Sequence, residues 1–334
     1  MLGRIMVRMS RSNNISSANF EFLVAQAVKA PSGHNTQPWK FRQNESAVEV
    51  YPDFDRRLPV VDPDDRELFV SLGCAVENLC LAAQTKGYKS VVSVGDTGIV
   101  TVSLMEEADV KPNPLFNQID ARQTNRSVYT GEEIALDALR KLQSVCSERG
   151  ISVHYCAHRT KQFNDIEQYV LQGNTHQMQN KAFKAELKSW MRFNKKHQDQ
   201  TLDGLSYAVF GAPNVPHWMA EPIMSMAINA KTQNKADCEK IASASHLVLF
   251  TTRENSRCEW VSLGRTLQRF LLTATELGIV HAYLNQPNEE AEIASEMTRT
   301  LGLAGEYPTI LLRIGYGKQQ AYSKRRAVKD VIER

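Results

Sequence analysis

The sequence lacks the features that mark secreted, membrane-spanning and disulfide-stabilised proteins. Its 6 cysteines are scattered along 334 residues without a C-x-x-C pair, so a secreted disulfide framework is not expected. No uncharged apolar run approaches the ~20 residues of a membrane span. The basic stretch at residues 1–11 continues into a polar segment and therefore lacks the apolar core of a signal peptide. These absences favour a reduced, cytoplasmic setting.

An excess of either charge is also missing. The chain has 40 Lys+Arg and 37 Asp+Glu, a formal net charge of +3. So small a charge creates no global field that would attract nucleic acid or an anionic membrane, and we expect neither as a partner. With 42% hydrophobic and 23% charged residues the composition is that of an ordinary folded protein. The length allows one large domain or two smaller ones.

Common signatures of cofactor-binding and catalytic sites are absent as well. The chain contains no G-x-G-x-x-G after a strand, no P-loop, no G-x-S-x-G and no H-E-x-x-H. The usual signals of dinucleotide-binding folds, P-loop enzymes, α/β-hydrolases and zincins are therefore missing. His154 and His158 flank the end of a predicted strand, and we favour surface or core roles for them over metal binding. No metal is expected.

Two long helix patterns in the chain are similar to each other. Residues 67–87 and 260–278 are both rich in small and apolar residues, as buried helices are. Aligning Gly73 with Gly264 superposes Val70-Ser-Leu-Gly73 on Val261-Ser-Leu-Gly264. Hairpin patterns at residues 39–50 and 90–104, and strand patterns at 247–250 and 310–314, accompany them. We predict an internally duplicated α+β chain with one half at residues 1–118 and the other at 119–334.

Three polar segments remain to be explained. The loop Pro31-Ser-Gly-His-Asn-Thr-Gln-Pro38 offers several hydroxyl and amide groups. In Arg122-Gln-Thr-Asn-Arg126, alternate side chains would point the same way from an extended segment and present two guanidinium groups and a hydroxyl to one anion. The third is the basic tail Lys324-Arg-Arg326. Taken singly, each also fits a simpler interpretation: a helix stop and turn, a solvated charged turn, and a solvated tail.

Together these segments resemble the nitroreductase superfamily of FMN proteins, in particular its fused, single-chain, Acg-like branch. The resemblance rests on stretches that occur in the same order: Ala30-Pro-Ser-Gly-His-Asn-Thr-Gln-Pro-Trp39, Arg122-Gln-Thr-Asn-Arg126, Leu277-Gly-Ile279 followed by Leu284-Asn-Gln-Pro287, and Arg313-Ile-Gly-Tyr-Gly317 with Ser323-Lys-Arg-Arg326. It implies a nitroreductase-like α+β fold of two tandem, degenerate copies that form an intrachain pseudo-dimer. Each copy would have a mixed, mainly antiparallel sheet with flanking helices.

The resemblance also implies one FMN site shared between the halves. The loop of the first half and the arginine segment and basic tail of the second would hold the cofactor, with Arg126 near the pyrimidine edge and the loop after the second long helix near flavin N5. The second half has no P-S-x-x-N loop and the N-terminal part has no R-x-S-x-R segment, so we expect one FMN per chain, for which a monomer is sufficient. The implied site residues are Ser32, Asn35, Gln37, Arg122, Thr124, Arg126, Asn285, Gln286, Lys324, Arg325 and Arg326.

The activity implied is that of an FMN-dependent oxidoreductase. Hydride would pass from NAD(P)H through flavin N5 to a small electron acceptor such as a nitroaromatic compound or a quinone, and no catalytic side chain is named because the flavin supplies the chemistry. The segment at residues 200–220 contains Gly204, Gly211, Pro213 and Pro216 and is predicted to be a long loop that acts as a lid. A closed lid leaves open a second function, an FMN-holding stress protein with little or no turnover.

A basic helix pattern gives a further alternative. Residues 181–196 carry lysines and arginine among Phe183, Leu187 and Trp190, a pattern that also occurs in helices that bind a membrane surface or nucleic acid. The simpler interpretation, which we favour, is a surface helix whose apolar residues pack on the body of the protein.

Overall fold

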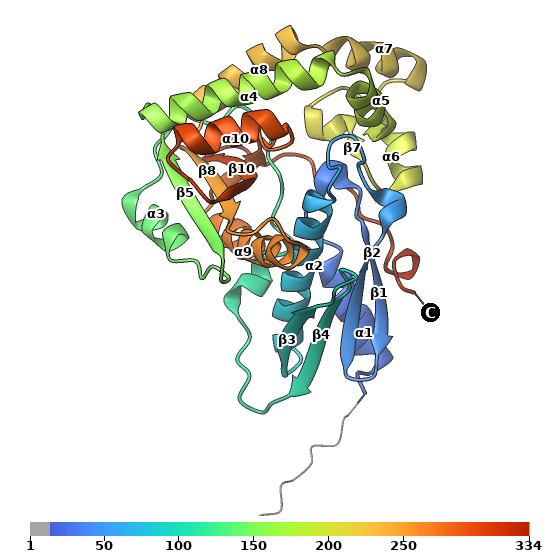
Figure 1. Cartoon of the computed structure of the whole chain (residues 1–334). Coiled ribbons are helices and arrows are strands. Elements are labelled where there is room, and N and C mark those ends of the chain that lie inside the picture. Colours follow the sequence, from blue (N-terminus) through green and yellow to red (C-terminus); the bar gives the residue numbers. More distant parts are fainter. Residues whose placement is uncertain (1–13, 334) are drawn as a thin grey trace, which may run out of the picture.

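Two long helices cross at the centre of the molecule (Figure 1). The computed structural model describes residues 14–333, apart from the side chains of residues 223–227; the expectation for residues 1–11 lies outside this range. The central helices are α2 (Arg66–Gln84) and α9 (Arg257–Glu276), as the sequence predicts. By length and composition α2 also passes as a membrane span, but 94% of its most apolar window is buried inside the fold. It is the core helix that its sequence indicates.

The crossing of α2 and α9 depends on a pair of glycines. A Cβ atom on Gly73 would lie 2.1 Å from the carbonyl oxygen of Val261, and one on Gly264 would lie 2.1 Å from the carbonyl oxygen of Val70. Real Cβ atoms do not approach an oxygen so closely, so both backbones require glycine here. The two contacts are reciprocal, and they join the tetrapeptides that repeat in the sequence.

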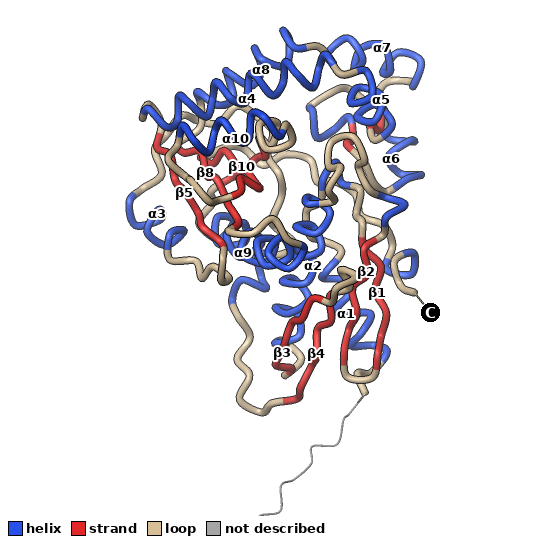
Figure 2. Tube along the Cα trace, viewed as in Figure 1, coloured by secondary structure: helices blue, strands red, loops and turns tan. Residues whose placement is uncertain are grey.

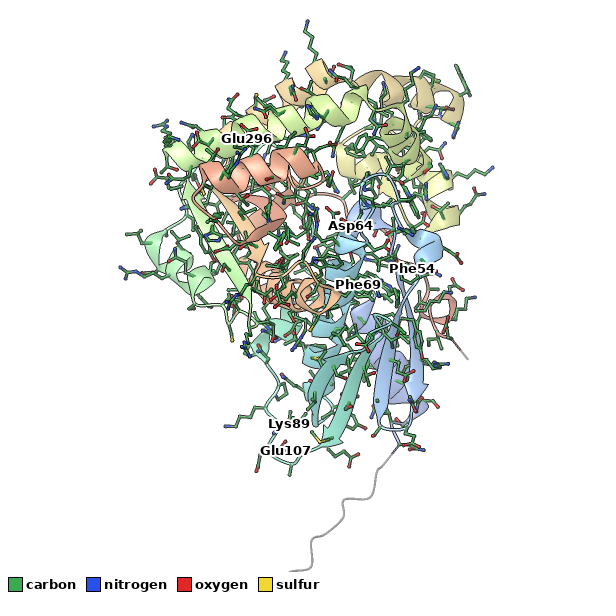
Figure 3. All side chains as sticks on the ribbon, in the orientation of Figure 1. Phe54, Asp64, Phe69, Lys89, Glu107 and Glu296 are labelled. Atoms are coloured by element: carbon green, nitrogen blue, oxygen red, sulfur yellow. The ribbon has the colours of Figure 1, made fainter. Side chains whose placement is uncertain are left out.

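An aromatic pair reinforces the same crossing. Phe69 of α2 and Trp260 of α9 stack with ring centroids 6.1 Å apart, and Figure 3 shows Phe69 inside the molecule while Lys89 and Glu107 lie at its edge. Aligning Gly73 with Gly264 also aligns Phe69 with Trp260. Equivalent residues of the two repeats therefore meet each other across the helix crossing.

The first sheet is antiparallel and has the strand order β1-β2-β4-β3. Both hairpins predicted from the sequence are confirmed. Helix α1 (Ser17–Ala27), whose first turn is capped by the side chain of Ser16, packs beside α2. The strands are β1 (Trp39–Asn44), β2 (Ala47–Pro52), β3 (Tyr88–Val94) and β4 (Val100–Glu106).

The second sheet is also antiparallel, in the order β5-β8-β10-β9. Helix α9 covers one face, and α4 and α10 lie against the other, with α8 packed on α4 (Figures 1 and 2). The strands are β5 (Ile151–Ala157), β8 (His246–Thr252), β9 (Val280–Tyr283) and β10 (Tyr307–Gly315). The helices are α3 (Leu136–Gln143), α4 (Lys161–Gln179), α8 (Ala230–Ala242) and α10 (Ala291–Thr300).

The predicted long loop at residues 200–220 is wrong, because short elements occupy most of it. Gly204 and Gly211 have φ of 72° and 70°, and each gives the chain a sharp turn beside a short element instead of forming part of an open loop. The elements in and around this segment are α5 (Lys181–Ser189), β6 (Met191–Arg192), α6 (Lys195–Thr201), β7 (Leu205–Ser206), η4 (Tyr207–Phe210) and α7 (His217–Ala227). β6 and β7 pair in parallel.

The basic helix pattern is packed as a surface helix. Phe183 of α5 is 6% exposed, and the Trp190 ring that follows lies under the guanidinium groups of Arg56 and Arg192, at 5.4 and 5.5 Å. These contacts use the apolar face that a membrane or nucleic-acid helix would leave free, and they support the simpler interpretation.

The two halves share one core. The largest cluster of buried apolar residues includes members from both sheets and both central helices. The C-terminal segment after η5 (Val328–Asp330) returns to the first sheet, where the Phe41 backbone nitrogen donates to the Val331 oxygen at 2.8 Å and the Glu333 nitrogen donates to the Phe41 oxygen at 2.8 Å. The predicted boundary after residue 118 falls at the end of η3 (Pro114–Gln118).

Replacing Gly73 with alanine is expected to disrupt the helix crossing. The new methyl group would overlap the α9 backbone, and overpacking that forces the backbone to shift typically costs about 1–3 kcal/mol. Urea unfolding of Gly73→Ala measures the loss. Gly95→Ala is the matched control, since a Cβ there meets its nearest atom at 3.6 Å without a positive φ. Equal stability of the two variants would contradict the role given to the crossing.

Candidate functional site

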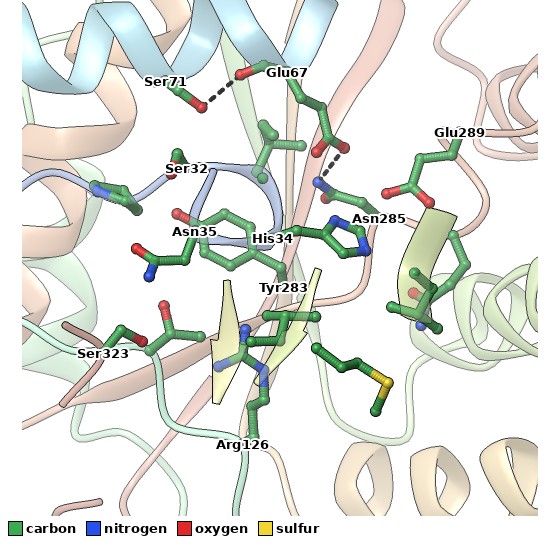
Figure 4. Close-up of a pocket in the computed structure, with 18 of the residues that line it drawn as sticks. Ser32, His34, Asn35, Glu67, Ser71, Arg126, Tyr283, Asn285, Glu289 and Ser323 are labelled. Carbon is green, nitrogen blue, oxygen red and sulfur yellow. Dashed lines mark hydrogen bonds between the residues drawn. The ribbon is translucent and has the colours of Figure 1, made fainter. Parts of the chain in front are cut away.

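A cavity of about 540 Å³ lies where the two halves meet (Figure 4). The first half contributes the loop at residues 31–35 and the first turns of α2; the second contributes residues 124–126, the loop after β9 and the segment around β7 and η4. A smaller cavity of about 200 Å³ adjoins it, because both are lined by Thr124, Ser323 and Arg325. Together they form one elongated site.

The first-half loop has an unusual backbone. His34, Asn35 and Gln37 have φ of 47°, 56° and 55°, in the left-handed region that side-chain-bearing residues seldom adopt. Such conformations cost of order 1–3 kcal/mol each and persist only where surrounding contacts impose them. One such contact is the Ser32 hydroxyl, which accepts a hydrogen bond from the Gln37 backbone nitrogen at 3.0 Å.

Gln37 and Asn35 connect this loop to the second half. The fully buried Gln37 side chain donates to the Leu202 carbonyl oxygen at 2.9 Å and accepts from the Arg326 backbone nitrogen at 2.8 Å. The Asn35 amide donates to the carbonyl oxygens of Gly204 and Lys324, both at 3.2 Å. The loop is thereby held between the segment that precedes η4 and the basic tail.

The arginine segment presents cations without acidic partners. Its extended backbone pairs with β9 through Thr124 and His281, so alternate side chains do reach the site. Arg122, 4% exposed, donates to the Lys29 carbonyl oxygen at 3.0 Å, and its Nε has no partner. Arg325 donates to the Asn35 side-chain oxygen at 2.9 Å and also has an unpartnered Nε. Within residues 14–333 neither forms an ion pair.

Burial destabilises the charged form of the arginines in the site. Burial, and after it the charge of Arg122, lowers the pKa of Arg325 to about 9. Burial also lowers the pKa of Arg122 and of Arg126. His34, whose pKa burial and Arg126 lower to about 4, is neutral at pH 7 and adds no charge. The site therefore carries uncompensated positive charge that an anion would neutralise.

The opposite side of the cavity carries carboxyl groups (Figure 4). Asn285 accepts a hydrogen bond from the Leu311 backbone nitrogen at 2.9 Å, which turns its amide nitrogen toward Glu67, and it donates to the Glu67 carboxyl at 2.7 Å. Gln177 donates to Glu289 at 2.5 Å. Burial, and after it the charge of Glu67, raises the pKa of Glu289 well above its usual range. The same two causes raise the pKa of Asp62 to about 7.

The structure brings most of the residues singled out from the sequence to this site. Arg122 lines the smaller cavity. Gln37, Lys324 and Arg326 line neither: Gln37 holds the loop, Lys324 contributes its backbone oxygen, and Arg326 donates to the Asp330 carbonyl oxygen at 2.8 Å. The residues that line the larger cavity are Ser32, Asn35, Thr124, Arg126, Asn285, Gln286 and Arg325.

Sequence analysis missed several residues of the cavity wall. His34 belongs to the loop at residues 31–38, but no second motif in the sequence marks it as a site residue. Glu67 and Tyr283 lie in a helix and a strand whose sequence patterns predict core packing and no binding role. Glu289 is followed by Glu290, and the sequence does not show which of the two carboxyls lines the cavity. Among the described residues no group of three or more potential metal ligands occurs.

The chain belongs to the nitroreductase family. The sequence profile of that family matches residues 119–316, more than half of the chain. Two proteins of Mycobacterium tuberculosis, from strains CDC 1551 and H37Rv and provisionally named NAD(P)H nitroreductases, are each 25% identical over 329 residues, covering 92% of this chain and 89% of the relative.

Solved structures of nitroreductases are similar over part of the chain. The FMN- and NADPH-dependent nitroreductase NfnB of Sphigopyxis sp. strain HMH matches 66% of this chain and 98% of its own, at 12% identity and a TM-score of 0.45. The FMN-dependent nitroreductase NfnB of Mycobacterium smegmatis, solved in complex with NADPH, matches 64% and 90%, at 13% identity and a TM-score of 0.39.

The raised pKa of Asp62 predicts a specific dependence of stability on pH. In the folded protein Asp62 keeps a proton that the unfolded chain releases above about pH 4. The contribution of Asp62 therefore lowers the free energy of unfolding as pH rises from about 4 through 7. Asp62→Asn removes the cost. Its free energy of unfolding relative to the wild type is expected to rise by at least about 1.4 kcal/mol, the value of one pKa unit, between pH 4.5 and pH 8.

Urea unfolding at the two pH values checks this expectation. The exposed neighbour Asp64→Asn is the matched control and is expected to show little change with pH. A stability difference for Asp62→Asn that is the same at both pH values would contradict the assignment.

Proposed function

We propose that the chain binds one FMN in the elongated site between its halves and uses it as an NAD(P)H-dependent oxidoreductase that reduces a small acceptor, such as a nitroaromatic compound or a quinone. The observation that carries this proposal concerns the guanidinium groups of Arg122, which is buried, and Arg325, which is half-buried. Within residues 14–333 neither forms an ion pair, and the Nε atom of each lacks a hydrogen-bond partner. Leaving a buried charge without its partner costs about 3–5 kcal/mol, and the phosphate of FMN supplies both the charge and the acceptors. The names of the M. tuberculosis relatives agree with this function.

The smaller cavity suits a phosphate. The free Nε groups of Arg122 and Arg325 and the Thr124 hydroxyl are the donors along its wall. Lys29 also lines it but is paired with Asp120 at 2.5 Å. Charge-assisted hydrogen bonds from guanidinium to phosphate are among the stronger polar contacts in proteins.

The larger cavity suits the flavin ring. Its volume lies within the ~300–1,000 Å³ typical of cofactor and ligand pockets, and its wall combines apolar side chains of α2 and α9, Val70 and Leu267, with polar groups. Arg126 would stabilise negative charge on the pyrimidine side of the ring. Asn285 and Gln286 would lie at the N5 edge. FMN itself supplies the hydride chemistry.

We further propose that the halves form an intrachain pseudo-dimer with only one working site. The alignment of Gly73 with Gly264 makes Arg265 the counterpart of Cys74, a small residue that lines the cavity. Arg265 is paired with Glu77 at 3.0 Å and with Glu148 at 3.1 Å. An ion-pair network thus stands where a second cofactor would need open space, which supports one FMN per chain without a partner subunit.

A specific observation also favours the second candidate, a flavin-holding protein with little turnover. Residues of the segment that was expected to be a lid line the cavity, namely Leu205 and Phe210, and the Arg126 guanidinium lies 5.8 Å from the Phe210 ring. Arg56 pairs with Asp203 and holds the start of this segment against the first half. Access to the cavity depends on whether this segment moves.

Replacing Arg122 with alanine is expected to weaken FMN binding about 10- to 100-fold, because a charged hydrogen bond contributes about 1.5–3 kcal/mol. Quenching of FMN fluorescence by the apoprotein measures the dissociation constant. Arg140→Ala, on the exposed face of α3, is the matched control and should bind as the wild type does. Unchanged affinity in Arg122→Ala would remove this residue from the phosphate site.

Anaerobic addition of NADPH separates the two candidate functions. An oxidoreductase is expected to lose its yellow colour within the mixing time of a manual assay, because movement of residues 200–220 admits the nicotinamide. A protein that binds FMN but stays yellow for hours would support the holding function, and one that binds no FMN would contradict both.

A further inference from the structure

The carboxyl groups of Glu67 and Glu289 meet in the cavity wall from opposite halves of the chain. Glu67 lies in the first turn of α2 and is 7% exposed; Glu289 lies in the loop after β9. Both carboxyls line the same cavity, and the charge of Glu67 acts on Glu289. Figure 4 shows both beside Asn285 and across the cavity from Arg126.

The two carboxyls accept hydrogen bonds from different donors. The Asn285 amide, oriented by the Leu311 backbone nitrogen, donates to Glu67, which stabilises negative charge there. Glu289 accepts a hydrogen bond from the neutral Gln177 amide. Burial and the adjacent Glu67 charge raise the pKa of Glu289. Burial and the neighbouring carboxyl of Glu67 therefore favour the protonated form of Glu289.

Neither of the two glutamates forms an ion pair within residues 14–333 that would neutralise its negative charge. The positive charge that acts on Glu289 is that of Arg66, and its guanidinium donates to the Asn288 carbonyl oxygen at 2.8 Å instead of pairing with either glutamate. Asp62 behind Glu67 adds a further acidic group, and His34 is neutral at pH 7.

We propose that Glu289 is the proton donor of the cavity, a catalytic residue that protonates the oxygen of the electron acceptor as the acceptor takes up hydride. The proposal rests on the function proposed above, because the reduced flavin supplies the hydride. Glu67 is the positioning residue that holds the proton on Glu289. The Glu289 carboxyl lies beside Asn285 (Figure 4), one of the residues assigned to the N5 edge.

The step balances for an acceptor with a carbonyl or nitroso oxygen. A quinone receives one hydride from the reduced flavin and one proton from Glu289, and a hydroquinone forms through its tautomer. Glu289 is left as a carboxylate beside Glu67, and repulsion between the two charges favours recapture of a proton from water. The acceptor class is therefore neutral, conjugated and able to accept a hydrogen bond.

A measurement without substrate tests the resting state. Infrared difference spectra of the flavin-loaded protein at pH 7, recorded against Glu289→Gln, are expected to show the C=O stretch of a protonated carboxyl that the variant lacks. Glu290→Gln is the matched control, since Glu290 lies next in sequence but does not line the cavity. A protonated-carboxyl band that persists in Glu289→Gln, or none in the wild type, would overturn the proposal.

Stopped-flow oxidation of the reduced protein tests the proton transfer. Loss of a positioned acid costs about 10²- to 10⁴-fold, so Glu289→Gln is expected to slow oxidation by benzoquinone by at least ~10²-fold while oxidation by ferricyanide, which takes electrons without a proton, stays within about twofold of the wild type. Equal slowing with both oxidants, or with neither, would contradict the role of Glu289.

The two proposals fail in different ways. If the protein binds no FMN, or binds it and is not reduced by NADPH, the proposed function fails. If flavin binding and reduction by NADPH are normal but the quinone reaction of Glu289→Gln is unchanged, only the proton-donor assignment fails. Circular dichroism and the melting temperature of the variant show whether it folds as the wild type does.

Discussion

The close crossing of α2 and α9 is the constraint on which the rest of the structure depends. Because the backbones touch at Gly73 and Gly264, the two sheets are held at a fixed separation and the first-half loop meets the second-half arginines. The helix that forms the crossing also carries Glu67 at its start. Packing and chemistry are thus joined on one element, and a shift of the crossing would displace the site as well as the core.

The site separates opposite charges across one cavity. Guanidinium groups that form no ion pair within residues 14–333 gather at one end, and the carboxyls of Glu67 and Glu289 stand at the other. This arrangement destabilises the protein on its own, because the charged groups at each end have no counter-charge close by. It suits a bound molecule with an anionic tail and a neutral, conjugated body, which is the chemical form of a flavin mononucleotide with an acceptor beside it.

Much of the fold could be predicted from the sequence, because it depends on local patterns. The hairpins, the central helices and the repeated tetrapeptide all follow from periodicity and from matching letters. The predicted long loop at residues 200–220 failed, since its glycines end short elements whose partners lie far away in sequence. At the site, Arg122 and Arg325 could be predicted from motifs. Glu67 and Glu289 could not, because only the folded structure brings these two carboxyls to the same cavity wall.

The central claim is that one FMN binds between the two halves of the chain. A crystal structure of the chain grown with FMN tests this most directly. The account predicts one flavin per chain, with its phosphate within hydrogen-bonding distance of Arg122 and Arg325 and its ring in the larger cavity between the halves. A flavin bound elsewhere, a second flavin on the opposite side of the helix crossing, or a phosphate that contacts neither arginine would contradict it.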